Sequence, residues 1–248
     1  MAKVTVVTAT TGNPLLANNI ESVARQTHAD IQHIVIVDGP ERRDAVNDII
    51  NHMNVEHLHK VVVHTLPYSI GKDRWNGHRI YGMSTYLAEG QHIMYLDDDN
   101  SIDPTHIEDC LKVIEAGNDW AYSMRKIRNK ECETLCLDDC ESLGQWPSVL
   151  DNSDYFIDVN CYFLPINLAV TITPVWYRKF REPGQMEIDR AMIRVLGQIA
   201  PKFDSTRNYT VNYTVGNTQN SVQAGFFEAG NAEMLRRYEG KLPWKKAQ

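Results

Sequence analysis

Short apolar segments alternate with amphipathic ones through the first half of the chain, and this alternation limits the fold more than any other feature. Residues 3–9, 33–39, 60–66 and 92–96 are rich in valine and isoleucine, as buried strands are. The segments between them carry apolar residues three and four positions apart, which is the period of a helix packed on one face. Strands that alternate with helices form βαβ units, and these build a mostly parallel sheet with helices on both faces. The sequence therefore predicts an α/β fold.

Helix signals separate these strands. Asn13 suits an N-cap, and Pro14 suits the first turn of a helix that ends near Thr27. The other elements expected in this half are helices at 45–53, within 73–90 and at 103–116, and a fifth strand at 120–124.

The second half of the chain is less regular. Residues 128–153 are polar, acidic and contain cysteines, and they indicate a long excursion between elements. The elements expected after it are a strand at 155–164, a helix at 186–199, a strand at 208–215 and a polar tail that contains glycine. No repeat or low-complexity linker divides the chain, so we expect one domain over 1–248, with a regular half at 1–125 and an irregular C-terminal half at 126–248.

The bulk composition argues against several classes of protein. The formal net charge is −7, from 32 acidic and 25 basic residues, which is a poor electrostatic footprint for tight nucleic-acid binding. No stretch approaches the roughly 18 apolar residues of a membrane span, and the N-terminus lacks the apolar core of a signal peptide. Five cysteines, an odd number, fit a reducing compartment better than a disulfide framework. We therefore expect a cytoplasmic protein without a membrane span.

Two patterns suggest a metal site at first sight. Cys132, Cys136 and Cys140 recur every fourth residue, which on a helix would place them on one face, but the second cysteine pair of a zinc ribbon is missing. His57 and His59 lie in a histidine-rich segment without a shared face or a partner acid. We interpret the cysteines as small apolar residues and the histidines as solvated.

Acidic residues follow two of the expected strands directly. Asp38 ends one apolar run, and Asp97, Asp98 and Asp99 end another. Adjacent carboxylates repel one another and are poorly solvated at the end of a buried strand. The carboxyl ends of parallel strands meet at one edge of the sheet, where such sheets bind ligands. Carboxylate oxygens suit Mg²⁺, Mn²⁺ or Ca²⁺, and one or two of them with substrate phosphates commonly hold Mg²⁺. The alternative is a solvated acidic turn that caps a helix at Asp103.

The residues from Val4 to Gly39 and from Gly71 to Asn100 resemble the nucleotide-binding half of glycosyltransferases with the GT-A fold, closest to family 2. The resemblance covers about 3–125 and is looser afterwards. It implies a Rossmann-like GT-A fold, a nucleotide-sugar-binding half at 1–125 and an acceptor-binding half with the catalytic base at 126–248. The acidic strand end matches the family's DxD motif, which binds a divalent metal at the diphosphate of the donor.

The same resemblance implies roles for individual residues. The motif positions fall on Asp97 and Asp99, which would hold Mn²⁺ or Mg²⁺, with Asp97 and Asp98 also at the nucleotide. The remaining residues expected at the nucleotide are Asp38 for the base, most often uracil, Thr8 and Thr10 for the base and ribose, and Lys72 and Arg74 for the phosphates. The alternatives are a plain turn at Asp38 and surface solvation for the basic residues.

The second half must supply a general base. In an inverting transfer the acceptor hydroxyl attacks the anomeric carbon as the diphosphate leaves, and a carboxylate takes the hydroxyl proton. The segment from Arg181 to Leu196 resembles the family's acidic motif at a helix start, with Glu187 and Asp189 as candidates. We prefer Asp189, although the adjacent Glu-Asp pair often found there is absent. The other acid would complement the helix dipole. No histidine follows His106, so the C-terminal metal-binding histidine of some GT-A enzymes is also absent.

The sequence thus predicts a metal-dependent, inverting glycosyltransferase that uses a nucleotide-diphosphate sugar, with a uridine donor preferred. Two alternatives stay open. A sugar nucleotidyltransferase would need a basic, glycine-rich loop after the first strand, where this chain has one glycine and no basic residue over 8–14. A catalytically inactive protein that binds nucleotide sugars or carbohydrates would not need both acidic motifs. The acceptor, whether glycan, lipid, protein or nucleic acid, leaves no mark in the sequence.

Overall fold

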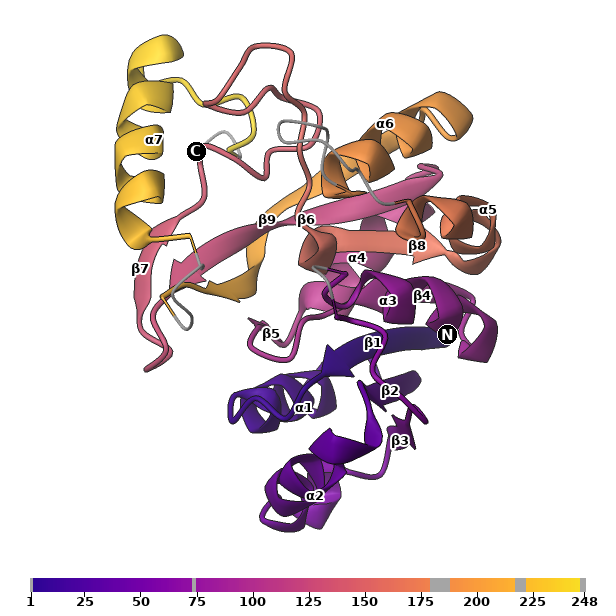
Figure 1. The fold of residues 1–248 in the computed structure, drawn as a ribbon. Helices are drawn as coiled ribbons and strands as arrows, with labels where there is room; N and C mark the ends of the chain where they lie inside the picture. Colours follow the sequence, from indigo (N-terminus) through magenta and orange to yellow (C-terminus); the bar gives the residue numbers. More distant parts are fainter. Residues whose placement is uncertain (1, 73–74, 179–187, 217–221, 246–248) are drawn as a thin grey trace.

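The structure is a computed structural model that describes residues 2–72, 75–178, 188–216 and 222–245 (Figure 1). The strands are β1 (Val4–Thr10), β2 (Ile31–Val37), β3 (Val61–Thr65), β4 (His92–Tyr95), β5 (Ser101–Ile102), β6 (Trp120–Arg128), β7 (Thr134–Leu137), β8 (Tyr162–Pro165) and β9 (Phe203–Thr214). The α-helices are α1 (Leu16–Ala24), α2 (Arg43–Asn51), α3 (His78–Ser84), α4 (His106–Glu115), α5 (Ile166–Trp176), α6 (Ile188–Ile199) and α7 (Ala224–Arg237).

Within the described residues one sheet runs in the order β3-β2-β1-β4-β8-β6-β9-β5, and β7 pairs with β6. β1 lies between β2 and β4, parallel to both, and β2 also pairs in parallel with β3. β8 lies antiparallel between β4 and β6, and β9 runs parallel to β6. The expected α/β fold with a mostly parallel sheet is therefore confirmed.

Alternate side chains of β2 explain why helices cover both faces of this sheet. Every residue of β2 is buried. Val35 and Val37 pack in one apolar cluster with α1 and α2, whereas Ile34 and Ile36 pack in another with Ile80 of α3. Successive side chains of a strand point to opposite faces, so a continuously apolar strand requires a cover on each side. The first half of the chain supplies both covers.

Two helices in the second half were not predicted. α5 is rich in β-branched residues and has Pro174 in its last turn, and both features disfavour a helix from local sequence. Its burial of Ile172 and Trp176 in the main core overrides that preference. The expectation of a polar tail at the C-terminus is wrong, because α7 buries Phe227 and Met234 against residues after β7. Figure 1 shows α7 beside β7, at the far end of the molecule from α2.

The expected strand at 155–164 is mostly wrong. Only its last residues form β8 at Tyr162–Pro165, and a short 3-10 turn at Val159–Cys161 precedes them. The expected strand at 208–215 forms the second half of β9.

The three regularly spaced cysteines do not share a helix face. Cys132 lies in a turn with a positive φ, Cys136 lies in β7, and Cys140 is buried in the loop that follows. No helix in the described part of the chain has the length and apolar character needed to cross a membrane.

Lowering the pH from 7 to 5 is expected to destabilise the fold, because two core histidines resist protonation. Burial lowers the pKa of His33 from 6.5 to about 3 and that of His106 from 6.5 to about 4. The unfolded chain binds protons at these rings below pH 6.5 and the folded chain does not. The free energy of unfolding is therefore highest above pH 6.5 and falls as the pH is lowered. By pH 5 the loss is about 2 kcal/mol for each ring.

Urea unfolding at the two pH values tests this expectation. The variant His106→Gln should show a smaller loss of unfolding free energy between pH 7 and pH 5 than the unmodified chain. Comparing the two chains cancels the contribution of the carboxylates, so an equal loss in both would contradict it.

Candidate active site

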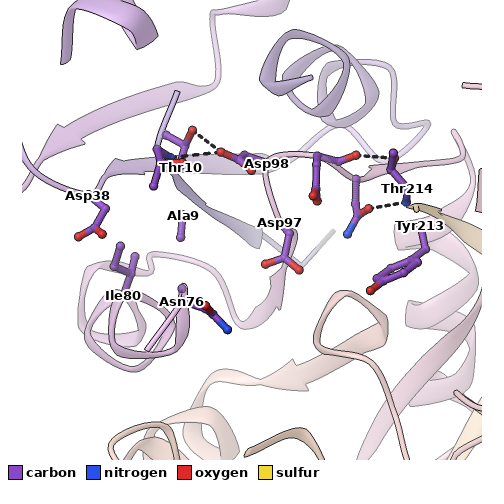
Figure 2. Close-up of a pocket in the computed structure, with 13 residues that line it drawn as sticks. Ala9, Thr10, Asp38, Asn76, Ile80, Asp97, Asp98, Tyr213 and Thr214 are labelled. Carbon is purple, nitrogen blue, oxygen red and sulfur yellow. Dashed lines mark hydrogen bonds between the residues drawn. The ribbon is translucent and has the colours of Figure 1, made fainter. Parts of the chain in front are cut away.

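A pocket of about 310 Å³ lies where β1, β2 and β4 end at the carboxyl edge of the sheet. Its lining comes from five parts of the chain: the ends of these three strands, the start of α3 and the end of β9 (Figure 2). The lining residues are Ala9, Thr10, Thr11, Asp38, Asn76, Gly77, Ile80, Asp97, Asp98, Asp99, Asn100, Tyr213 and Thr214. Figure 2 shows Asp97 between Asp38 on one side and Tyr213 on the other. The expected meeting of the acidic strand ends is thus found.

The Asp98 carboxylate is directed at the turn after β1. Its Oδ2 accepts a hydrogen bond of 2.6 Å from the Thr10 hydroxyl and one of 3.2 Å from the Thr11 N–H. The Thr10 hydroxyl in turn accepts a hydrogen bond of 3.0 Å from the Gly12 N–H. Burial raises the pKa of Asp98, and these donors oppose the rise. Thr10 and Asp98 therefore lie together in the lining of the pocket.

The Asp97 carboxylate is held from the opposite side. The Tyr81 hydroxyl donates to its Oδ1, and the Asn160 Nδ2 donates to its Oδ2 at 2.9 Å. The Asp97 backbone N–H donates to the Asn160 Oδ1 at 2.6 Å. Burial, together with the negative charge of Asp158, raises the pKa of Asp97 to about 6. Each oxygen of this carboxylate keeps a lone pair for a further ligand.

The end of β9 fixes the backbone after Asp98. The Thr214 hydroxyl donates to the Asp99 carbonyl at 2.6 Å, and the Thr214 N–H donates to the Asn100 Oδ1 at 2.8 Å. β9 therefore brings Tyr213 and Thr214 from the far end of the chain to the acidic strand end. Both residues lie in a segment that was predicted as a strand, but nothing in its sequence indicates that the strand reaches the site.

Asp38 anchors the loop that follows β3. Its Oδ1 accepts from the Ile70 N–H at 2.7 Å, and its Oδ2 accepts from the Ser69 hydroxyl at 2.8 Å and from the Gly71 N–H at 3.1 Å. A side chain at Gly71 would place its Cβ 2.6 Å from the Asp38 Oδ2 and 2.7 Å from the Asn76 carbonyl oxygen. The loop can approach Asp38 this closely only with glycine at that position.

Three other residues, Thr8, Lys72 and Arg74, were expected at the nucleotide, and Thr8 and Lys72 are not among the lining residues of the pocket. Thr8 is fully buried, and its hydroxyl lies 3.1 Å from the Asn19 Oδ1 and 3.0 Å from the His33 Nε2. Its side chain therefore belongs to the core below the strand end. Lys72 is exposed in the loop after Gly71. Arg74 lies outside the described residues.

Asp189 lies in the first turn of α6, close to the start of α3. Its Oδ1 is 4.0 Å from the His78 Nε2, and its backbone carbonyl accepts from the Tyr162 hydroxyl at 3.3 Å. Burial lowers the pKa of His78 to about 4, so this imidazole is neutral at pH 7. His78 directly follows Gly77, which lines the pocket. Glu187, the other candidate base, lies outside the described residues.

An aromatic cluster joins Asp189 to the acidic strand end. The Trp176 ring lies 5.9 Å from the His78 ring and 5.6 Å, edge-on, from the Tyr81 ring. Because Tyr81 donates to Asp97, one packed unit supports both the candidate base and the first acid of the motif.

The oxygen atoms of the pocket fit a hard divalent cation that is coordinated partly by the protein and partly by a substrate. In the described residues no group of three or more histidine, cysteine, aspartate or glutamate side chains could hold a metal ion. Asp97 and Asp99 offer carboxylate oxygens, which Mg²⁺ and Mn²⁺ accept. A cation held by two carboxylates would complete its coordination with water or with the phosphate oxygens of a ligand.

A second pocket, of about 650 Å³, runs along the outer side of α6. Helix residues Arg190, Ile193 and Gly197 form one wall, and Tyr155 belongs to the opposite loop. Nothing lies within 4 Å of the position that a Cβ on Gly197 would take, so this wall is open.

Comparison with known proteins identifies the family. The model of glycosyl transferase family 2 matches residues 5–135, more than half of the chain, and the chain belongs to this family. The chain is therefore a glycosyltransferase by family and has the expected GT-A fold. No curated protein matches the sequence at a significant level.

Solved structures agree with this fold. The crystal structure of S. aureus TarS superposes with a TM-score of 0.58 and 14% identity over 95% of this chain and 43% of that chain. The crystal structure of S. aureus TarS 1–349 in complex with UDP superposes with a TM-score of 0.59 and 14% identity, and the match covers 96% of this chain and 72% of that chain. The complex of TarS 1–349 with UDP-GlcNAc superposes with a TM-score of 0.58 and 13% identity, and the match covers 95% of this chain and 72% of that chain. This chain thus spans less than half the length of the longest of these structures.

The variant Gly71→Ala is expected to lower the free energy of unfolding by about 1–3 kcal/mol, because its Cβ has no room beside Asp38. Gly197→Ala is the matched control. Its Cβ meets no atom, and alanine favours a helix interior over glycine by up to about 1 kcal/mol, so this variant should be more stable than the unmodified chain. Urea denaturation of both variants measures the two effects. Equal stability of the two variants would show that the loop moves away from Asp38 without cost.

Proposed function

We propose that this glycosyltransferase transfers a sugar from a uridine-diphosphate donor to an acceptor hydroxyl, with inversion at the anomeric carbon and with a divalent metal ion. The observation that carries the proposal is the single pocket that joins Asp38 to Asp97, Asp98 and Asp99 at the carboxyl edge of a family 2 sheet. The UDP and UDP-GlcNAc complexes of TarS, which shares this fold, support the choice of donor.

Asp38 would bind the base of the donor. Its Oδ1 accepts one hydrogen bond, from Ile70, and so keeps a second lone pair for the N–H of uracil. The loop that Asp38 anchors would close over the base, since Asn76 and Gly77, a few residues further on, also line the pocket. Thr10 would lie at the ribose, with Asp98 orienting its hydroxyl.

The diphosphate would lie toward the acidic strand end, where Asp97 and Asp99 would hold Mn²⁺ or Mg²⁺. When bound, the cation offsets the negative charge that develops on the leaving diphosphate. Lys72 and Arg74 would add positive charge at the same group. Tyr213 lines the pocket opposite Asp38 and would contact the sugar end of the donor.

Asp189 would take the proton from the acceptor hydroxyl as that oxygen attacks the anomeric carbon. A base for this step must be ionised, partly shielded from water and close to the donor. The Asp189 side chain is 21% exposed and lies beside His78, whose imidazole is neutral at pH 7.

The C-terminal half would bind the acceptor. α6 carries Asp189 in its first turn, and the second pocket starts at the next residue, Arg190, and follows the helix for two turns. An acceptor with its hydroxyl at Asp189 could place its remaining groups along that wall. The exposed ring of Tyr155 and the polar groups of Arg190 and Asp154 suit a carbohydrate.

UDP is expected to bind more tightly with Mn²⁺ than without it. In isothermal titration calorimetry, Asp99→Asn should weaken UDP binding with Mn²⁺ by at least about tenfold, or 1.4 kcal/mol, and should leave binding without metal unchanged. Asp38→Asn should weaken binding under both conditions, because it acts at the base. Absence of UDP binding to the unmodified chain in both conditions would refute the donor assignment.

Asp189→Asn is expected to retain UDP-sugar binding and to lower sugar transfer or donor hydrolysis by roughly 10²–10⁴-fold, the usual contribution of a general base. Release of UDP from a panel of UDP-sugars measures turnover, and calorimetry measures binding. If the unmodified chain binds donors but never turns them over, the alternative of an inactive binding protein holds. If Asp189→Asn turns over normally, the base is a different residue.

A further inference from the structure

The Asn160 side chain makes three hydrogen bonds, and two of them are to Asp97, the first acid of the motif. Its Oδ1 accepts from the Asp97 N–H at 2.6 Å, and its Nδ2 donates to the Asp97 Oδ2 at 2.9 Å. The same Nδ2 donates to the Asp158 Oδ1 at 2.7 Å. Asn160 is fully buried. A single side chain therefore fixes both the backbone and the carboxylate of Asp97.

The sheet register brings these two residues together. β4 and β8 are antiparallel, with His92 opposite Pro165 and Met94 opposite Phe163. Asp97 lies three residues after Met94, and Asn160 lies three residues before Phe163, in the short 3-10 turn that leads into β8. β8 inserts next to β4 from the second half of the chain, so the contact depends on a pairing between strands that are distant in sequence.

The amide of Asn160 can adopt only one orientation. Its NH₂ group lies between the carboxylates of Asp97 and Asp158, and its oxygen faces a backbone N–H. A flipped amide would turn its oxygen toward two carboxylates and leave the Asp97 N–H facing a donor. The charge of Asp158 therefore determines the direction in which Asn160 presents its groups to Asp97.

Asp158 is itself held by a buried arginine. Arg125 is 1% exposed and donates to Asp158 at 2.5 Å, to Asp138 at 2.7 Å and to Glu141 at 2.6 Å. The guanidinium carbon also lies 4.3 Å from the centre of the Tyr213 ring, which lines the pocket. One buried cation thus supports two lining residues of the pocket: Asp97, through Asp158 and Asn160, and Tyr213, through a direct contact with its ring.

We propose that Asn160 is a positioning residue that orients the Asp97 carboxylate for the metal and diphosphate of the donor, and that the Arg125 cluster fixes Asn160 in this role. The inference rests on the proposed function, because it concerns how the same site holds its metal. Residues that orient a metal ligand commonly change metal affinity by about 10–100-fold when they are removed.

The chain contains a matched control residue, an asparagine whose hydrogen bonds stabilise the fold but do not reach the pocket. Asn231 in α7 accepts from the Asp139 N–H at 2.9 Å and donates to the Leu137 carbonyl at 2.7 Å. It resembles Asn160 in joining a backbone N–H to an acceptor, but it contacts residues near β7 rather than the pocket. Asn231→Ala removes a comparable set of hydrogen bonds without touching Asp97.

The test is calorimetric titration of UDP, with and without Mn²⁺, into the full chain and the variants Asn160→Ala and Asn231→Ala. In Asn160→Ala the gain in UDP affinity given by Mn²⁺ should fall at least about tenfold, while affinity without metal stays unchanged. Asn231→Ala should match the unmodified chain in both titrations. Thermal unfolding of each variant confirms that the comparison is made on folded protein.

The outcomes separate the inference from the proposed function. If the unmodified chain gains nothing from Mn²⁺, the metal-dependent function fails, and the inference falls with it. If the unmodified chain gains and folded Asn160→Ala gains equally, the inference alone is overturned. Should Asn160→Ala not fold, Asn160→Ser takes its place with the same expectation, because a hydroxyl is too short to reach both the N–H and the carboxylate of Asp97.

Discussion

Repulsion between three consecutive carboxylates at the end of β4 is the constraint around which the site is built. The structure relieves it by turning the groups apart. Asp98 faces hydrogen-bond donors at the turn after β1, whereas Asp97 faces Tyr81 and Asn160 on the other side. The backbone at Asp99 is fixed by β9. Each neighbour comes from a different element, so the assembled sheet is required to hold these acids in these different directions.

The two halves of the chain contribute differently to this arrangement. The first half supplies the parallel strands and the acids at their ends, as expected for a sheet that binds ligands at its carboxyl edge. The second half supplies the supports: β8 beside β4, β9 beside the acidic turn, and a buried Arg125 that faces three carboxylates. A buried cation of this kind adds little net stability, because its desolvation offsets its attractions. Arg125 instead contacts all three carboxylates directly, at 2.5–2.7 Å.

The parts of the site that follow from local sequence were predictable. An acidic residue directly after an apolar strand can be recognised in the sequence as a candidate site residue. The parallel pairing of β1, β2 and β4 then places Asp38 with Asp97. Asn160 and Tyr213 could not be found in this way, since their roles depend on strand neighbours in the irregular half. The same limit applies to α5, where burial of Trp176 overrides β-branched composition and a proline. Tertiary packing outweighs local preference at these points.

The register between β4 and β8 has a consequence for how sequences of this kind can change in length. An insertion or deletion between Asn160 and Phe163 would shift Asn160 along the chain relative to Asp97, because the β4–β8 register keeps Phe163 opposite Met94. Such a change would remove the hydrogen bonds between Asn160 and Asp97 without altering any acid of the motif. The segment is therefore fixed in length by the chemistry of a residue about sixty positions away, whereas surface loops elsewhere are free to vary in length.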